Sequence, residues 1–294
     1  MFRQVNFAMK KFLAQASISF LASIIIAAVV LLAGPARAEN TLRWASQGDA
    51  ITMDPHAQNE GQTRTFAQQV EEPLISRKPD LTKMPGLAVS WRLVEPTVWE
   101  FKLRPNVKFH DGRPFTADDV VFSFKRALMP TSDMKEIISS VANVSAVDHL
   151  TIRIRTKEPD PILLDELTNI FIMSRGWAEE HDVTTPQDTA GGQETYAVRN
   201  ANGTGPFKLE LREPDVRTVM VKNPDWWGLQ ENPHNIDRIV YTPIKNPATR
   251  VAALLSGELD FLLDPPVQDL VRIASSDAFQ IQREPGYTNP TAII

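Results

Sequence analysis

The stretch from Trp99 to Arg126 constrains the fold more than any other part of the chain, because several structural signals follow one another in it. Apolar and charged side chains alternate over its first six residues, a period of two that predicts a strand with one buried face. The dipeptide Asp111-Gly112 then predicts a tight turn. Thr116, with an acid three residues later at Asp119, approximates a capping box, and an apolar stripe follows. The stretch is therefore expected to form a strand, a turn, a second short strand and a capped helix.

The first 38 residues differ from the rest in composition. They begin with a basic segment, continue as an uncharged apolar run over residues 12–33, and end in Ala36-Arg37-Ala38. This order is typical of a secretory signal peptide that is cut before Glu39. The alternative is an uncleaved membrane anchor, since about 20 apolar residues can span a bilayer.

The net charge and the absence of cysteine exclude several classes of function. Removing residues 1–38 takes away four of the 31 basic residues and none of the 36 acidic ones, which leaves 27 against 36 and a net charge of −9. A secreted protein this acidic is a poor candidate for binding nucleic acid or an anionic membrane surface. The chain has no cysteine, which excludes a disulfide, a thiolate metal site and a lipid anchor on a cysteine. The mature chain is therefore expected to be free in the periplasm.

Three segments together point to one protein family. They are WEFKLRPNVKFHDGRPFTADDVVFS from Trp99, Gly203-Thr204-Gly205-Pro206-Phe207, and Asn223-Pro224-Asp225-Trp226-Trp227-Gly228. They resemble the family 5 extracellular solute-binding proteins of the dipeptide- and oligopeptide-binding type, which are the receptors of peptide and nickel ABC importers. The resemblance implies an α/β fold like that of the type II periplasmic binding proteins, with a mixed-sheet first lobe and a small subdomain.

The resemblance also implies how the chain is divided. Residues 39–75 and 204–294 are expected to form the first-lobe sheet, and residues 76–203 the small inserted subdomain. The similarity extends over residues 41–285 and then stops, whereas family members continue through a second lobe. We therefore expect a C-terminally truncated chain in which the second lobe is largely missing.

Further local signals predict backbone structure. Asn246 as an N-cap, Pro247 at the first helical position and Gly257 after the last turn predict a helix that leads directly into a strand, which indicates an α/β unit. The glycines of Gly203-Thr204-Gly205 are expected to supply left-handed backbone conformations at a turn, because their spacing does not match a phosphate-binding loop. The adjacent aromatics Trp226-Trp227 suggest a ligand platform, although packing under a loop is the preferred interpretation.

The ligand-binding residues are predicted from the resemblance, which places the end of the first strand and the following turn near the ligand. Within that turn, Asp49 could hold a ligand ammonium through its carboxylate, or it could be an ordinary solvated loop residue. The helix expected over residues 63–72 could present two further polar side chains to the cleft. The candidate site residues are Gln47, Gly48, Asp49, Ala50, Thr65 and Gln69.

The resemblance implies the solute-binding component of an ABC importer, which captures short peptides or peptide-like solutes in the periplasm and delivers them to a permease in the inner membrane. A monomer is expected, with no cofactor, no metal site and no nucleic acid partner. Relatives on the same scaffold also carry nickel chelates, opines or sugars, so the sequence leaves the solute open. Because the ligand of this family is enclosed between two lobes, binding by one lobe is expected to be weak.

An enzyme is not expected, because the chain has none of the common hydrolase or zinc motifs. A secreted hydrolase stays open as an alternative, in which His110-Asp111 would be half of a triad or a metal pair. An ordinary surface pair is the preferred interpretation of these two residues. A periplasmic signalling protein is a third interpretation, supported only by the predicted secretion.

Overall fold

The computed structural model describes residues 39–192, 194–282 and 291–293, and contacts divide the chain into residues 1–39 and a second unit, Asn40–Ile294. Everything below concerns the second unit. The predicted signal peptide, residues 1–38, lies outside the described residues. Among the residues that are described, no helix has both the length and the apolar composition needed to cross a membrane.

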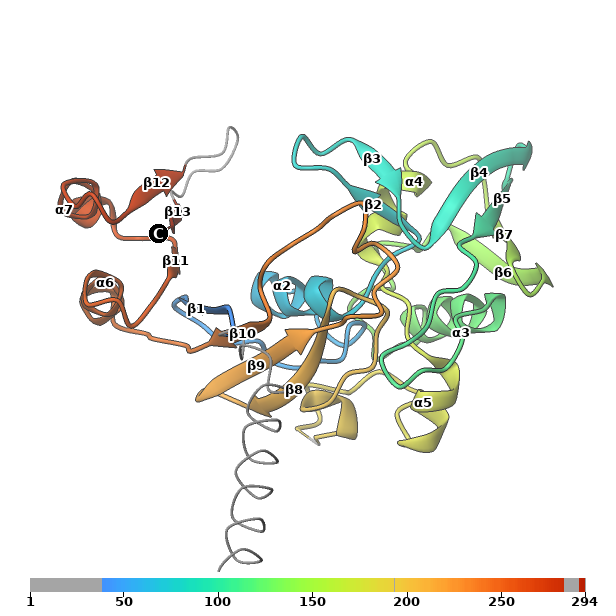
Figure 1. Ribbon diagram of the computed structural model, residues 1–294. Helices are drawn as coiled ribbons and strands as arrows, with labels where there is room; N and C mark the ends of the chain where they lie inside the picture. Colours follow the sequence, from blue (N-terminus) through green and yellow to red (C-terminus); the bar gives the residue numbers. More distant parts are fainter. Residues whose placement is uncertain (1–38, 193, 283–290, 294) are drawn as a thin grey trace, which may run out of the picture. The chain divides into compact units, whose positions relative to one another are not determined.

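A seven-stranded mixed sheet is built around β1, the first strand of the described chain (Figure 1). β1 pairs in parallel with β10 on one side and with β11 on the other. Beyond these neighbours the pairing is antiparallel, with β9 and β8 at one edge and β13 and β12 at the other. In order across the sheet, the strands are β12 (Gln280–Gln282), β13 (Thr291–Ile293), β11 (Phe261–Leu263), β1 (Thr41–Ala45), β10 (Arg238–Tyr241), β9 (Arg217–Lys222) and β8 (Phe207–Glu213).

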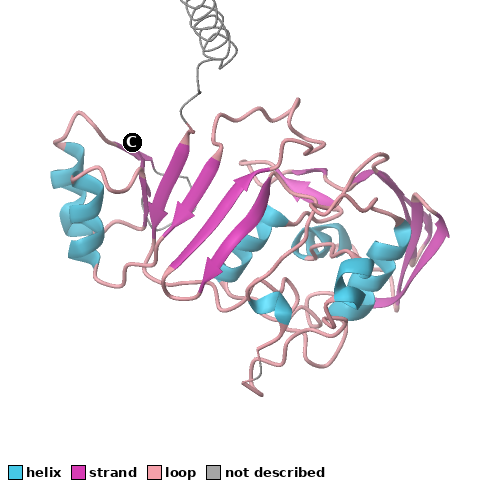
Figure 2. Ribbon diagram, turned by 60° about the horizontal axis from the view of Figure 1, so that its bottom comes forward, coloured by secondary structure: helices cyan, strands magenta, loops and turns pink. Residues whose placement is uncertain are grey.

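A separate four-stranded antiparallel sheet comes entirely from the chain between β1 and β8 (Figure 2). Helix α3 (Ala117–Ala127) packs against β6 and β7 of this sheet. Phe101, Phe124 and Ile152 are each at most 1% exposed in the core that the sheet and the helix share. In order, its strands are β4 (Ala88–Glu95), β5 (Val98–Leu103), β7 (Thr151–Thr156) and β6 (Val141–Asp148).

Short elements connect the two sheets. Helix α2 (Gly61–Val70) follows β1, and a two-stranded hairpin, β2 (Ile75–Arg77) and β3 (Lys83–Pro85), leads from it into the four-stranded sheet. The segment between β7 and β8 holds two short α-helices and two 3₁₀ turns. They are α4 (Leu163–Glu166), Leu167–Asn169, α5 (Arg175–Glu180) and Tyr196–Val198.

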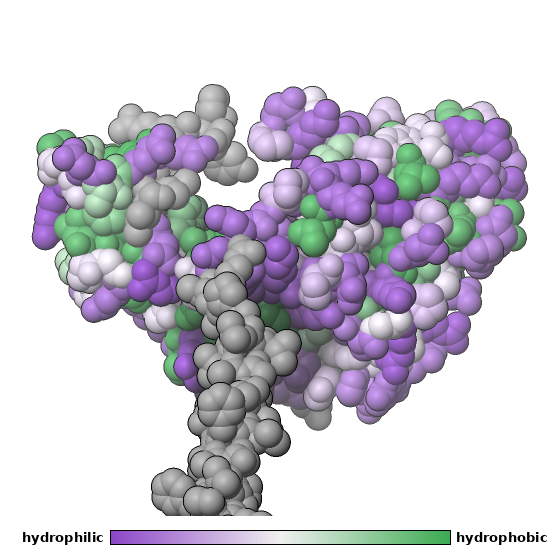
Figure 3. Space-filling model, in the orientation of Figure 1, coloured by the Kyte–Doolittle hydropathy of each residue, from purple (hydrophilic) through white to green (hydrophobic). Residues whose placement is uncertain are grey.

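The chain after β10 forms a small core of its own against β11. Helix α6 (Pro247–Leu255) begins at the predicted cap, where the Asn246 side chain accepts a hydrogen bond from the Thr249 N–H at 3.0 Å, and it ends before Gly257, whose φ is +78°. A 3₁₀ turn (Val267–Asp269) and α7 (Leu270–Ala274) follow, with Val267 and Val271 74% and 81% exposed. Figure 3 shows apolar residues gathered over the region of α6 and α7.

The stretch from Trp99 to Arg126 folds largely as predicted, with a strand at β5 and a helix at α3. The Thr116 N–H donates to Asp119 Oδ2 at 2.9 Å, so an aspartate serves in place of the usual glutamate. Gly112 has a φ of +90°, as a tight turn requires. The expected second strand is reduced to one isolated bridge between Lys108 and Pro114.

The Gly203-Thr204-Gly205 turn corrects one expectation. Neither glycine has a positive φ; the positive-φ glycines of the described chain are Gly112, Gly192 and Gly257. Glycine is required here because the returning chain passes directly over the end of α2. A Cβ at Gly203 would lie 1.9 Å from the Val70 carbonyl oxygen, and one at Gly205 would lie 2.8 Å from it.

Gly203→Ala is expected to destabilise the protein by about 1–3 kcal/mol, because an added methyl group would displace backbone that has no room to move. Urea denaturation of the purified full chain measures the loss. Gly61→Ala is the matched control, since no atom lies within 4 Å of a Cβ at that position. An alanine there should leave stability unchanged or raise it by up to about 1 kcal/mol. Equal stability of the two variants would show that the contact at Gly203 is not tight.

Candidate functional site

Helix α2 separates the core of the large sheet from a polar surface. Its N-cap is Glu60, whose carboxylate accepts hydrogen bonds from two backbone N–H groups of the first turn, both at 2.8 Å. One face of the helix is buried among the apolar residues of the sheet. At 3.6 residues per turn, Arg64, Gln68 and Glu71 share a second face. This face carries both a basic and an acidic side chain.

A pocket of about 450 Å³ lies along this second face. It is lined by Arg64, Gln68 and the two acids after α2, by the β2–β3 hairpin, by residues of the segment 168–171, and by Trp226. The volume falls within the range of small-molecule sites. A pocket that contains a guanidinium and two carboxyl groups can bind a ligand that itself carries a carboxylate and an ammonium group.

Arg64 contributes a half-buried positive charge to the pocket. Its Nη2 donates to Asn169 Oδ1 at 2.8 Å and its Nη1 to the Asn169 carbonyl oxygen at 3.3 Å. The guanidinium carbon lies 5.4 Å from the centroid of the Phe171 ring, within the range of a cation–π contact. Burial lowers the pKa of Arg64. In the described part of the chain no carboxylate pairs with this guanidinium.

Two adjacent acids, Glu71 and Glu72, close the other end of the pocket. They are 2% and 7% exposed. Burial raises the pKa of Glu71 well above its ordinary value and the pKa of Glu72 to about 7. Glu72 Oε2 accepts from the Trp227 indole N–H and from the Thr204 hydroxyl, both at 2.7 Å, and Oε1 accepts from the Trp226 indole N–H at 3.0 Å. These donors favour the charged carboxylate, but burial outweighs them.

Trp226 and Trp227 hold the loop after β9 against this acid. The guanidinium carbon of Arg104 lies 3.8 Å from the centroid of the Trp227 ring, so Trp227 is clamped between a cation and a carboxyl group. Trp226 also lines the pocket. Trp227 therefore packs within the fold, which was the preferred interpretation from the sequence. Trp226 both packs within the fold and lines the candidate site.

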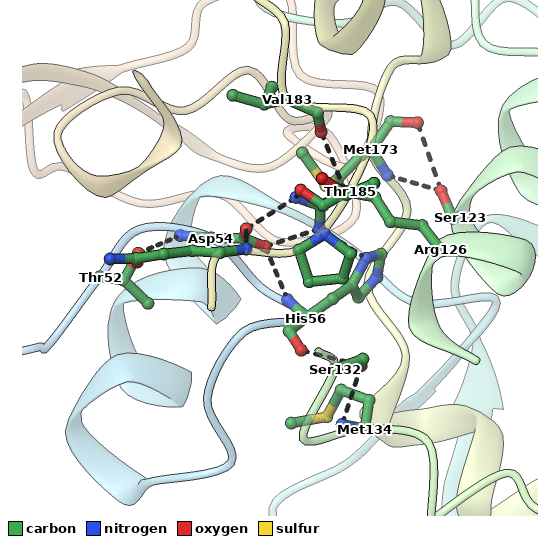
Figure 4. Close-up of polar contacts among 12 residues, drawn as sticks. Thr52, Asp54, His56, Ser123, Arg126, Ser132, Met134, Met173, Val183 and Thr185 are labelled. Carbon is green, nitrogen blue, oxygen red and sulfur yellow. Dashed lines mark hydrogen bonds and ion pairs between the residues drawn. The ribbon is translucent and has the colours of Figure 1, made fainter. Parts of the chain in front are cut away.

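A buried ion pair lies close to Glu71, and Figure 4 shows it in detail. Arg126 and Asp54 are both 0% exposed and are joined by two hydrogen bonds, at 2.6 and 2.7 Å. Burial alone would raise the pKa of Asp54, but Arg126 more than offsets this and the pKa is lowered. Arg126 Nη1 also lies 3.1 Å from His56 Nδ1. Burial and the neighbouring Arg126 lower the pKa of His56 to about 4, which leaves its ring neutral near pH 7.

The turn after β1, where four of the candidate residues lie, packs against the first turn of α2. Ser46 Oγ lies 3.3 Å from Gln62 Oε1, and the Ile51 N–H donates to the Thr63 hydroxyl at 3.1 Å. Asp49 does not offer a free carboxylate. Its Oδ2 accepts from Arg212 Nη1 at 2.7 Å in an ion pair whose side chains are 5% and 0% exposed. Its charge is already balanced inside the fold, so Asp49 is not the solvated loop residue of the second interpretation, and its role toward a ligand stays a prediction.

The other candidate residues are spread over two elements. Gln47 and Gly48 are exposed and Ala50 is buried, and the Gly48 carbonyl accepts a hydrogen bond from the Tyr241 hydroxyl. The Thr65 hydroxyl donates to the Gly61 carbonyl at 2.9 Å. Thr65 and Gln69 share a flank of α2 that is turned away from the pocket face, and neither lines the pocket. The ligand roles of these residues stay predictions.

His110 and Asp111 serve the fold rather than a catalytic pair. His110 Nε2 lies 3.0 Å from the Gly205 carbonyl oxygen, and Asp111 Oδ2 accepts from Asn202 Nδ2 at 2.9 Å. Both contacts join the turn after β5 to the glycine turn. His110 is partly buried, whereas Asp111 is exposed, so only His110 departs from the ordinary surface pair that the sequence suggested.

Sequence analysis indicated helix α2 but not the residues of its pocket face. A signal was present, because Arg64 near the start of α2 and Glu71 at its end have the order of charges opposite to the one that stabilises a helix dipole. Glu72 carried a second signal, since an acid next to Glu71 and before Pro73 at the end of an amphipathic helix is a candidate for burial with a partner. Its partners, Trp226 and Thr204, are too distant in the sequence to be found from spacing.

Comparison with known proteins assigns the chain to a family. Residues 82–292 match the family described as bacterial extracellular solute-binding proteins, family 5 Middle. A putative ABC transporter peptide-binding protein of Brucella ovis is 30% identical over 214 residues, which are 71% of this chain and 39% of that protein. The nickel-binding periplasmic protein of Escherichia coli is 28% identical over 238 residues, which are 78% of this chain and 43% of that protein.

A solved structure shows the same fold. The periplasmic binding protein DppA from Helicobacter pylori, in complex with the peptide STSA, has a TM-score of 0.74 and 25% identity over 83% of this chain and 50% of that chain. The chain therefore spans half or less of the length of these relatives, and its fold is that of part of a type II periplasmic binding protein. It belongs to family 5 of the bacterial extracellular solute-binding proteins.

Proposed function

We propose that this chain is part of the periplasmic solute-binding component of an ABC importer that captures short peptides or peptide-like solutes. Membership in family 5 supports the class of function, and a peptide is bound by the DppA protein of similar fold. The observation that carries the proposal is the pocket beside α2, where two arginines, Arg64 and Arg77, and two buried acids line one cavity. Short peptides carry a carboxylate and an ammonium group that match these side chains.

We further propose that residues 39–75 and 204–294 act as the first lobe and residues 76–203 as the small subdomain. The large sheet draws all its strands from the first two ranges, and the four-stranded sheet draws all of its own from the third. A ligand would be closed between this lobe and a second one by a hinge motion. If closure by both walls gives a micromolar complex, worth about −8 kcal/mol, one wall with half of that energy binds near millimolar.

The location and partner follow from the same proposal. The basic, apolar and Ala36-Arg37-Ala38 segments support export with cleavage before Glu39. A monomer in the periplasm would then present its ligand to a permease in the inner membrane. Sequencing the N-terminus of the protein from the periplasmic fraction should give Glu39 first, and an intact Met1 in the membrane pellet would contradict export of a free protein.

Calorimetry or ligand-observed NMR on the full chain should detect di- to pentapeptides with dissociation constants near millimolar. The same titration with a nickel–histidine chelate, an opine and a disaccharide distinguishes the solute classes. Binding of one of these three without any peptide would refute the peptide assignment and keep the solute-binding one. Turnover of peptide or ester substrates, abolished by His110→Ala, would instead favour a hydrolase.

A further inference from the structure

Beyond its favourable N-cap, Glu60, helix α2 places a basic residue near its start and an acid at its C-cap. The N-terminus of a helix favours acids and the C-terminus favours bases, because of the helix dipole. Arg64 is the fourth residue of α2, and Glu71 is its C-cap. Neither charge stabilises the helix where it stands, so both need another explanation, and both line the same pocket. Such local conflicts are expected where a residue serves a site rather than the fold.

Some of the hydrogen-bond donors of Arg64 are available to a ligand. A guanidinium group has five N–H bonds, and the contacts to Asn169 and to the Met134 sulfur use Nη1 and one N–H of Nη2. Within the described residues, Nε–H and the second N–H of Nη2 have no acceptor. A planar guanidinium held by Asn169 and stacked on Phe171 is well placed to bind a carboxylate with two parallel hydrogen bonds.

Glu71 is the matching group at the other end. It is 2% exposed, and its Oε2 has no hydrogen-bond partner in the described structure. An unpaired polar oxygen at this depth costs free energy unless something else binds it. Nearby Asp54 repels a negative charge on Glu71, whereas Arg126 and a ligand cation would favour it.

The spacing of the two residues gives the size of the ligand. They are seven residues apart on one helix face, and a rise of 1.5 Å per residue separates their Cα atoms by about 10 Å along the axis. Three residues of extended chain span about 10 Å. We propose that, within the solute-binding function proposed above, Arg64 binds the carboxylate and Glu71 the ammonium group of a ligand of tripeptide length.

The test uses three probes on the full chain: trialanine, trialanine amide, and N-acetyl-trialanine. NMR titration can follow the indole N–H signals of Trp226 and Trp227, which lie beside the pocket and bond to Glu72. Trialanine is expected to bind about tenfold or more tightly than either blocked probe, since each block removes one charge-assisted contact. Arg64→Gln should abolish the preference for the acid over the amide but keep the preference for the free amine. Glu71→Gln should do the reverse.

Arg175→Gln is the matched control, because this arginine is 53% exposed on α5, pairs with Glu179, and does not line the pocket. It should keep both preferences, and thermal melting should confirm that all variants fold. Equal affinities for the three probes would overturn the inference and leave the proposed function standing. Failure of all three probes to bind at about 5 mM would also overturn it, and the solute panel described above then tests the function separately.

Discussion

Replacing Arg126 with leucine is expected to lower the free energy of unfolding by about 3–5 kcal/mol, the usual cost of leaving a buried charge without its partner. Arg126 is fully buried and gives Asp54 two hydrogen bonds, at 2.6 and 2.7 Å. It also donates to the backbone carbonyls of Val183 and Thr185, at 3.1 and 2.9 Å. The substitution removes all of these bonds and exposes Asp54 to an apolar neighbour. Urea denaturation of the full chain measures the loss.

Two comparisons make this prediction specific to the buried pair. Arg175→Leu removes an arginine whose ion pair with Glu179 is about half exposed, and it should change stability by no more than about 0.5 kcal/mol. Adding Asp54→Leu to Arg126→Leu removes both buried charges, so the double variant should lose less than the sum of the single losses. A loss below about 1 kcal/mol in Arg126→Leu would show that water or another group replaces the arginine.

The Arg126–Asp54 ion pair connects three segments of the chain. Asp54 lies after β1, Arg126 near the end of α3, and the two carbonyls after α5, so one guanidinium joins three segments that share no strand pairing. Figure 4 shows these segments meeting around the arginine. A local sequence pattern cannot reveal such a contact. Arg126 lies in the last turn of an amphipathic helix, where a positive charge is expected simply because it stabilises the helix dipole.

Local signals did identify the elements. α3 and α6 were predictable because each begins or ends at a residue with a specific conformational preference, such as Thr116, Asn246 or Gly257. β5 was predictable because its apolar and charged residues alternate. Gly203 shows the limit of this reasoning. The turn was predicted, but its cause is the approach of the Val70 carbonyl, which belongs to another part of the chain. Conformation is local, whereas close approach depends on the tertiary fold.

The candidate site was only partly predictable for the same reason. Resemblance indicated α2, one face of which lines the pocket, and the turn after β1, which packs on the first turn of α2 and contributes no residue to the pocket lining. The helix period gave no preference between the flank of Thr65 and the flank of Arg64, because both lie beside the buried face. The partner of Asp49 could not be foreseen either, since Arg212 lies on β8, far along the chain.

The stability of the protein is expected to fall by about 3 kcal/mol between pH 4.5 and pH 7 through Glu72 alone. Its pKa is raised to about 7 in the folded state by burial, against an ordinary 4.5. The folded state therefore holds a proton that the unfolded chain releases in this range, and stability decreases as pH rises. One pKa unit corresponds to about 1.4 kcal/mol, which gives the stated size. Below pH 4.5 both states are protonated and the contribution is complete.

The test compares pH profiles rather than single stabilities. In Glu72→Gln, an amide N–H₂ replaces one oxygen, and whichever indole faces it, Trp226 or Trp227, loses its acceptor. This variant is therefore less stable at every pH, but its denaturation free energy should lack the decrease assigned to Glu72. Glu258→Gln, at an exposed position, should keep the wild-type profile. Because Glu71 and His56 titrate in all three proteins, their effects cancel in the difference. Parallel profiles for Glu72→Gln and wild type would mean that Glu72 is charged in the folded protein, stabilised by its two indole donors and Thr204.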